Sequence, residues 1–122
     1  MLKNDLYTIH DYHGTEDSAT ASLLLRPDHP LFAGHFPGRP VLPGACMLQM
    51  IKEIMETTLN LSLQLTHSPA IKFLSPVIPA DNPALKAELS WQVEGGLIRV
   101  QATLATGTTP CFRFAGTFRP LA

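Results

Sequence analysis

The sequence predicts an α+β domain that combines an antiparallel sheet of about six strands with a single helix. Several segments of the chain alternate apolar and polar residues, which is the period of a half-buried strand. One stretch alone repeats its apolar residues at helical spacing. A parallel sheet would need a helix for each crossover, so one helix favours antiparallel pairing through hairpins.

The size and charge of the chain narrow its class. Its 122 residues fit one domain, 1–122, and a domain this small gains buried apolar area by pairing with a second copy. A net charge of −1 gives no general attraction to nucleic acid or anionic membranes. The start of the chain lacks the apolar run of a signal peptide, and no segment has the length of a membrane span, so a cytoplasmic location is expected.

The first two expected strands form a hairpin. Residues Leu6 to Tyr12 are rich in strand formers, and Ala19 to Leu25 alternate after the Gly14–Asp17 turn. The remaining expected strands are Ala70–Leu74, Leu85–Val93, Ile98–Leu104 and Cys111–Phe118. Cys46 and Cys111 lack the spacing of a disulfide scaffold or a zinc site, so both are expected as reduced thiols in or near the core.

The segment from Arg26 to Gly44 is expected to be a long loop that carries the functional site. Five prolines and three glycines in this segment exclude a helix interior and a central strand. Long loops without secondary structure are uncommon in small domains and are often functional. The prolines also lower the entropy lost when such a loop adopts a single shape.

A helix is expected from Ala45 to about Leu59, after Pro43, because the first turn of a helix tolerates proline. Its apolar face contains Met47, Met50, Ile51, Ile54 and Met55. The opposite face forms a narrow polar stripe of Gln49, Lys52, Glu53 and Glu56. Such a stripe is typical of any amphipathic helix and is often simply solvated.

Residues 29–44, HPLFAGHFPGRPVLPG, closely resemble the signature loop of the bacterial 3-hydroxyacyl-acyl-carrier-protein dehydratases. The resemblance continues through the helix and recurs weakly at residues 71–81. It implies a hot-dog fold, in which a curved antiparallel sheet wraps round a central helix. It also implies that two subunits pair their sheets and share two active sites, without a cofactor.

The resemblance assigns catalytic roles to two residues of this segment. His35 would be the base that removes a proton from the carbon next to the thioester carbonyl, and a neutral imidazole suits that task near neutral pH. The amide of Gly44 would point toward the thioester oxygen, where a helix N-terminus favours developing negative charge. The simpler interpretation of His35 is a histidine that only hydrogen-bonds the backbone of its loop.

The chain departs from the family pattern at Gln49. The family carries an acidic residue there, supplied by the opposite subunit, and an amide cannot protonate a leaving hydroxyl. Four residues later the family usually carries Gln, whereas this chain has Glu53, on the same helix face. Glu53 is therefore a candidate for a displaced catalytic acid, against the alternative that it belongs to the solvated stripe.

Other candidate residues concern the substrate and its carrier. Residues expected to line the acyl site are Phe32, Phe36, Pro43, Met47 and Phe73. Arg39 and Lys72, with Arg26, could dock an acidic carrier protein or its phosphopantetheine, although exposed cations often only aid solubility. His10, His13, His29 and His67 lack the spacing of metal ligands, so no metal is expected.

The leading functional hypothesis is a dehydratase that eliminates water from a 3-hydroxyacyl thioester on acyl carrier protein to give the trans-2-enoyl thioester. Fatty-acid or polyene-type biosynthesis would be the setting. The alternative, which rests on Gln49, is a catalytically degenerate acyl-binding subunit that pairs with an active homologue in a hetero-oligomer. A hot-dog thioesterase is a weaker third hypothesis. The sequence determines neither the acyl chain length nor the preference for carrier protein over coenzyme A.

Overall fold

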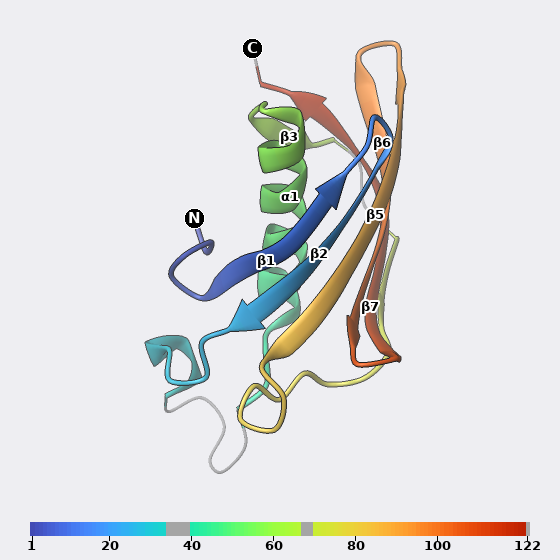
Figure 1. Ribbon diagram of the computed structural model, residues 1–122. Coiled ribbons are helices and arrows are strands. Elements are labelled where there is room, and N and C mark those ends of the chain that lie inside the picture. Colours follow the sequence, from blue (N-terminus) through green and yellow to red (C-terminus); the bar gives the residue numbers. More distant parts are fainter. Residues whose placement is uncertain (34–39, 67–69, 122) are drawn as a thin grey trace.

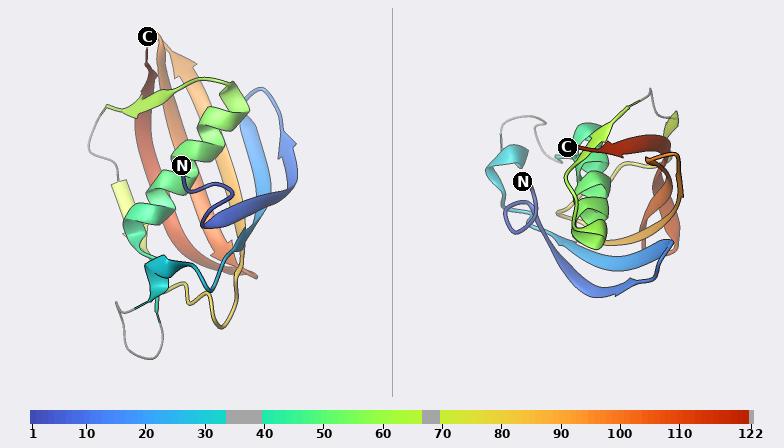
Figure 2. Two further views of the ribbon diagram at one scale, coloured as in Figure 1. Left: turned by 90° about the vertical axis from the view of Figure 1, so that its left-hand side faces the viewer. Right: turned by 90° about the horizontal axis from the view of Figure 1, so that it is seen from above.

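The helix α1, Gly44–Leu59, lies against one face of a single curved sheet (Figure 1). The computed structural model describes residues 1–33, 40–66 and 70–121. Seen from above, the sheet curls around α1, and the N-terminal segment lies on the side of the helix away from the sheet (Figure 2). The predicted α+β hot-dog architecture is confirmed.

Neighbouring strands of the sheet are all antiparallel. Within the described residues their order is β1-β2-β5-β6-β7-β3, and β4 also pairs with β7. Their bounds are β1 Tyr7–Gly14, β2 Ser18–Leu25, β3 Leu63–Leu65, β4 Ala70–Phe73, β5 Ala84–Glu94, β6 Leu97–Thr106 and β7 Thr109–Pro120. Each of the six expected strands is present, with ends shifted by a few residues.

The hairpin of β5 and β6 shows why the alternation predicts strands correctly. Leu85, Ala87, Leu89 and Trp91 are all less than 5% exposed, whereas the residues between them face solvent. Successive side chains of a strand point to opposite faces, so one face of the hairpin packs on α1 and the other is exposed to solvent. The turn that joins the strands contains Gly95 and Gly96 at φ values of 58° and 80°, which favour glycine.

α1 begins at Gly44, one residue before the predicted start, and Pro43 is its N-cap with extended backbone. The helix ends at Leu59, because Asn60 adopts the left-handed conformation (φ 53°). The predicted apolar face is confirmed, since each of its members is 3% exposed or less: Met47, Met50, Ile51, Ile54 and Met55.

Two short elements were not predicted. Pro30–Phe32 form a 3-10 helix, η1, inside the long loop, and the ring nitrogen Nδ1 of His29 accepts a hydrogen bond from Leu31 N (2.9 Å) at its start. The three-residue strand β3 is too short to show an alternating pattern. A carboxylate oxygen of Glu56 accepts a hydrogen bond from Leu63 N (2.8 Å) and so fastens β3 to α1. Glu56 is therefore more than a solvated member of the polar stripe.

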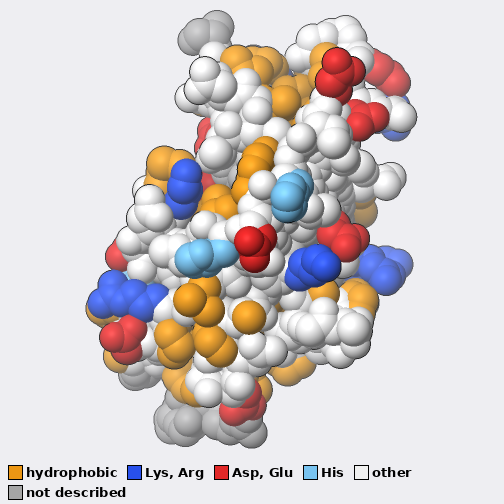
Figure 3. Space-filling view, viewed as in Figure 1, with side chains coloured by type: hydrophobic (Ala, Val, Ile, Leu, Met, Phe, Trp, Pro, Cys, Tyr) orange, Lys and Arg blue, Asp and Glu red, His pale blue; other side chains and the backbone are white. Residues whose placement is uncertain are grey.

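One face of the molecule carries scattered charges of both signs. On the face seen in Figure 3, lysines, arginines, aspartates and glutamates alternate with apolar side chains and do not form a patch of one sign. Cys46 and Cys111 are free thiols, half-buried and buried respectively, as predicted. Within the described ranges, no helix combines the length and apolarity that crossing a membrane would require.

The packing of α1 on the sheet predicts a large difference between two truncations. Ile54 is fully buried, so Ile54→Ala should lower the free energy of unfolding by about 2–5 kcal/mol through lost burial and a cavity. Val93 is 63% exposed on β5, and Val93→Ala should cost at most about 0.5 kcal/mol. Urea unfolding followed by fluorescence of the single tryptophan, the buried Trp91, measures both. Equal losses would contradict this placement of α1.

Candidate active site

Glu53 lies at the centre of a buried hydrogen-bond network. Its side chain projects from α1 toward the N-terminal segment and is 0% exposed. Carboxylate oxygen Oε1 accepts hydrogen bonds from Lys3 N (2.8 Å) and Tyr7 Oη (3.0 Å). Oxygen Oε2 accepts them from Leu2 N (2.9 Å) and Gln49 Nε2 (2.9 Å). Four donors thus surround one carboxylate.

The network favours the ionised form of Glu53. Burial alone would raise its pKa, but the hydrogen bonds from Leu2, Gln49, Lys3 and Tyr7 outweigh burial and hold the pKa below its ordinary value. Burial, together with the neighbouring Glu53 charge, raises the pKa of Tyr7, so this phenol remains a donor. At neutral pH the pair is a carboxylate and a neutral phenol.

This geometry excludes one of the two sequence-based interpretations of Glu53 and leaves the other, the displaced acid, as a prediction. The solvated-stripe interpretation is wrong for this residue, because its side chain is fully buried. A displaced acid would need a proton to donate, whereas an ionised carboxylate with four donors only accepts hydrogen bonds. The arrangement suits an anchor better than an acid.

Gly44 lies at the N-terminus of α1, where the first backbone N–H groups of a helix have no partner within the helix. Within the described part of the chain, no hydrogen bond from Gly44 N is present. The ring of Phe73 lies so close that a Cβ atom at this position would overlap it. Glycine therefore leaves room for an aromatic ring beside a backbone N–H that has no partner among residues 1–33, 40–66 and 70–121, at the positive end of the helix dipole.

Gln49 is half-buried at a groove of about 460 Å³ between α1, β3 and β7. The groove is otherwise lined mainly by apolar residues: Leu48, Lys52, Leu63, Gln64, Leu65, Phe118 and Leu121. Five helical positions place Gln49 about 7.5 Å along the axis from Gly44 and roughly 140° around it. One chain therefore presents the Gly44 amide and the Gln49 side chain in different directions.

Of the residues expected to line the acyl site, Phe73 is the exposed one within the described residues (64%), and its ring centroid lies 5.6 Å from that of Phe112. Pro43 is half-buried at the start of α1. Phe32 and Met47 are 6% and 3% exposed and belong to the core of the single chain. The structure thus brings Phe73 to Gly44. His35, Phe36 and Arg39 lie outside the described residues.

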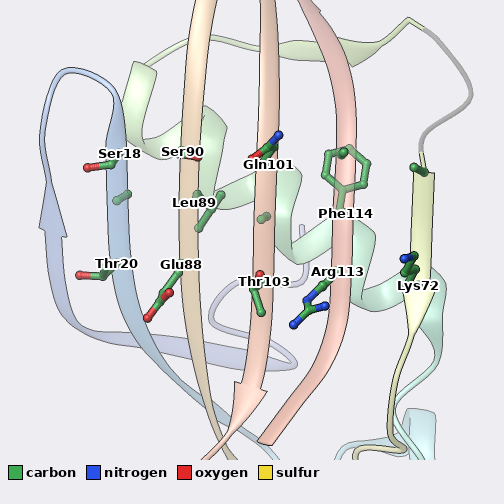
Figure 4. A pocket seen from close by; sticks show the side chains of 14 residues that line it. Ser18, Thr20, Lys72, Glu88, Leu89, Ser90, Gln101, Thr103, Arg113 and Phe114 are labelled. Carbon is green, nitrogen blue, oxygen red and sulfur yellow. The ribbon is translucent and has the colours of Figure 1, made fainter. Parts of the chain in front are cut away.

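Lys72 lies on the opposite face of the sheet from α1, in a groove of about 540 Å³ (Figure 4). It is the cross-strand neighbour of Arg113 on β7, and both side chains line this groove. This face therefore carries two neighbouring cations, and the carboxylate of Glu88 lines the same groove. Arg26, in contrast, is paired with Asp5 (3.9 Å) and Asp28 (3.2 Å).

The sequence could not reveal the partners of Glu53. Leu2 and Lys3 contribute backbone N–H groups, which leave no trace in residue type, and they lie about 50 positions away along the chain. Tyr7 lies within the predicted strand and resembles any strand residue. The one available signal is the exchange of residue types between Gln49 and Glu53 relative to the family pattern. Among residues 1–33, 40–66 and 70–121, no cluster of three His, Cys, Asp or Glu side chains could hold a metal ion.

The family match covers most of the chain, from within β1 to the end of β6. The sequence matches the ApeI-like family, described as ApeI dehydratase, over residues 11–108, and the chain belongs to this family. It is 31% identical to a 3-hydroxyacyl-[acyl-carrier-protein] dehydratase FabZ of Ehrlichia chaffeensis, over 73% of this chain and 74% of that protein. The FabZ of Chlamydia trachomatis is 35% identical over 62% of this chain and 56% of its own length. The chain thus spans little more than half of that relative.

A solved structure shares the fold. It is the dehydratase heterocomplex ApeI:P from Xenorhabdus doucetiae, which matches with a TM-score of 0.72 and 21% sequence identity. The match covers 91% of this chain and 96% of that one. At this identity the likeness establishes the architecture of a sheet wrapped round α1.

The Glu53 network predicts a pH-dependent stability. A carboxylate whose pKa is lowered by folding stabilises the protein above its unfolded-state pKa, and the stabilisation is lost as pH falls through the folded-state value. Glu53→Gln turns an amide NH₂ toward two of the four donors and should cost about 2–4 kcal/mol at pH 7. Urea unfolding between pH 7 and about pH 3 should show the difference from wild type shrinking. A difference independent of pH would contradict an ionised Glu53.

Proposed function

We propose that the protein is a 3-hydroxyacyl-thioester dehydratase that eliminates water from a substrate carried by acyl carrier protein. The observation that carries the proposal is the family match over residues 11–108, which includes the His-Phe-Pro-Gly segment and the start of α1. The N–H of Gly44, which has no hydrogen-bond partner among the described residues, supports it, because a thioester oxygen needs a donor as negative charge develops on it.

In the proposed reaction His35 removes a proton from C2 of the substrate while the Gly44 amide donates to the thioester oxygen. The bond between C3 and its hydroxyl then breaks, the C2–C3 double bond forms, and the hydroxyl takes up a proton to leave as water. Gln49 cannot supply this proton, and Glu53 holds none at neutral pH. The proton that His35 has accepted is the available source, with Gln49 as a hydrogen-bond partner of the hydroxyl.

Two subunits fit this site better than one. Gly44 and Gln49 point in different directions from one α1, so a site that uses both draws them from different chains. Phe73 and Leu74, 64% and 44% exposed, place an apolar surface beside the start of α1 where a second subunit could pack. Lys72 and Arg113, with Arg39, are the cations we propose for docking the acidic carrier. A cytoplasmic location remains a prediction.

The alternative function is a subunit that works with an active homologue. Its specific support is Gln49, together with the involvement of Glu53 in four hydrogen bonds, which leaves this chain without a free carboxylic acid on that part of α1. The shared fold with a dehydratase heterocomplex makes such pairing structurally reasonable. In this case the homologue would supply the acid and this chain would supply His35.

Turnover distinguishes the two functions. Purified protein should convert a 3-hydroxyacyl-carrier substrate into a product lighter by one water, and His35→Ala should abolish the conversion because it removes the base. His13→Ala, at an exposed position on β1, is the matched control and should retain activity. Mass spectrometry of the carrier measures both. Conversion that appears only after mixing with a homologue would establish the partner subunit instead.

Gln49→Glu tests whether a missing acid limits the rate. The new carboxyl would lie about as close to Glu53 as the amide does, 2.9 Å, and two carboxyl groups at that distance share a proton. One of them should stay protonated near neutral pH, so kcat should rise and gain a falling limb at higher pH. The double variant Gln49→Glu/Glu53→Gln restores the family order and should keep the gain. Unchanged kcat in both variants would show that acid supply is not limiting.

A further inference from the structure

Glu53 connects three parts of the chain that the proposed reaction treats as separate. Through Oε1 and Oε2 it binds the backbone of Leu2 and Lys3, the phenol of Tyr7 on β1, and the amide of Gln49 on α1. Within the described residues no cationic side chain is paired with this buried carboxylate. A buried charge without a counter-ion persists only when hydrogen bonds satisfy it, so the network must remain closed for Glu53 to stay ionised.

We propose that Glu53 is a positioning residue, which holds the N-terminal segment against α1 and fixes the amide of Gln49 so that its carbonyl oxygen faces away as a hydrogen-bond acceptor. The inference rests on the proposed function for its meaning in catalysis. The structural part, that Glu53 holds the N-terminal segment and orients Gln49, rests only on the four hydrogen bonds of Glu53.

The orientation of the Gln49 amide follows from the chemistry of its neighbour. A carboxylate is an acceptor only, so the side of Gln49 that faces Glu53 at 2.9 Å must be the NH₂ group. The usual ambiguity between the oxygen and nitrogen of an amide is thereby removed. Within the described residues no donor to Gln49 Oε1 is present, and the side chain lies at the groove between α1, β3 and β7.

A fixed carbonyl oxygen recognises a hydroxyl group. The 3-hydroxyl of a 3-hydroxyacyl thioester can donate to it, whereas a saturated acyl chain offers nothing at that carbon. A hydrogen bond of ordinary net strength should therefore favour the 3-hydroxyacyl chain by about threefold to tenfold. Without Glu53, the amide would rotate freely and the preference would fall.

Nuclear magnetic resonance tests the structural part without any turnover. In the wild-type protein, the side-chain NH₂ of Gln49 and the backbone amides of Leu2 and Lys3 should be protected from exchange, and the Gln49 signal should titrate with Glu53. Glu53→Gln should lower all three protections at least about tenfold. Glu56→Gln, on the same helix, is the matched control and should affect Leu63 instead. Unchanged protection in Glu53→Gln would overturn the proposal.

Tyr7→Phe keeps the test decisive if Glu53→Gln does not fold. It removes one of four donors and leaves the ring in the core, so the fold should persist while the Gln49 signal titrates at a higher pH than in wild type. An unchanged titration would contradict the closed network.

Binding tests the recognition part. The probes are the 3-hydroxyoctanoyl and octanoyl thioesters of pantetheine, measured by calorimetry in the His35→Ala background so that no reaction follows. The 3-hydroxy probe should bind about threefold to tenfold tighter, and adding Glu53→Gln should abolish the difference. Equal binding of the two probes before that change would overturn the recognition role, whereas absent turnover in the wild type would count against the proposed function alone.

Discussion

One face of α1 packs against the curved sheet and is completely buried. It consists of four residues without exposed surface: Met50, Ile51, Ile54 and Met55. This contact fixes both the rotation and the axial position of the helix, because a shift by one residue would expose part of the apolar face. The polar groups of α1 take their directions from that constraint. Gly44 stands at the free end of the helix, Gln49 faces a groove, and Glu53 faces the N-terminal segment.

A fixed helix also explains how a carboxylate comes to be buried without a cation. When the apolar face of α1 packs on the sheet, Glu53 lies beneath the segment that leads into β1. The free-energy cost of removing its carboxylate from water must then be offset by nearby hydrogen bonds. The main-chain N–H groups of Leu2 and Lys3, with the Tyr7 phenol, provide that compensation at 2.8 to 3.0 Å. The N-terminal segment and the helix thus stabilise each other.

The sequence predicted the architecture well because period-two alternation in β5 and β6 and the helical repeat of α1 follow directly from which face is buried. It predicted less about the site. A three-residue strand such as β3 carries too little pattern, and backbone donors such as Leu2 N carry none. Gln49 and Glu53 looked like exchanged residue types across one helical turn. Their contact at 2.9 Å shows that they act as one hydrogen-bonded pair.

Glu53 binds the backbone N–H groups at positions 2 and 3 and not their side chains. The residue types at these two positions are therefore free to change during evolution. Replacing Leu2 or Lys3 by almost any residue leaves an N–H in place, so substitutions there should be nearly silent. Proline, which has no N–H, and insertions or deletions between these positions and Tyr7 would break the attachment. Relatives that retain an acidic residue at position 53 should therefore vary in residue type at positions 2 and 3 yet keep the spacing between these positions and Tyr7.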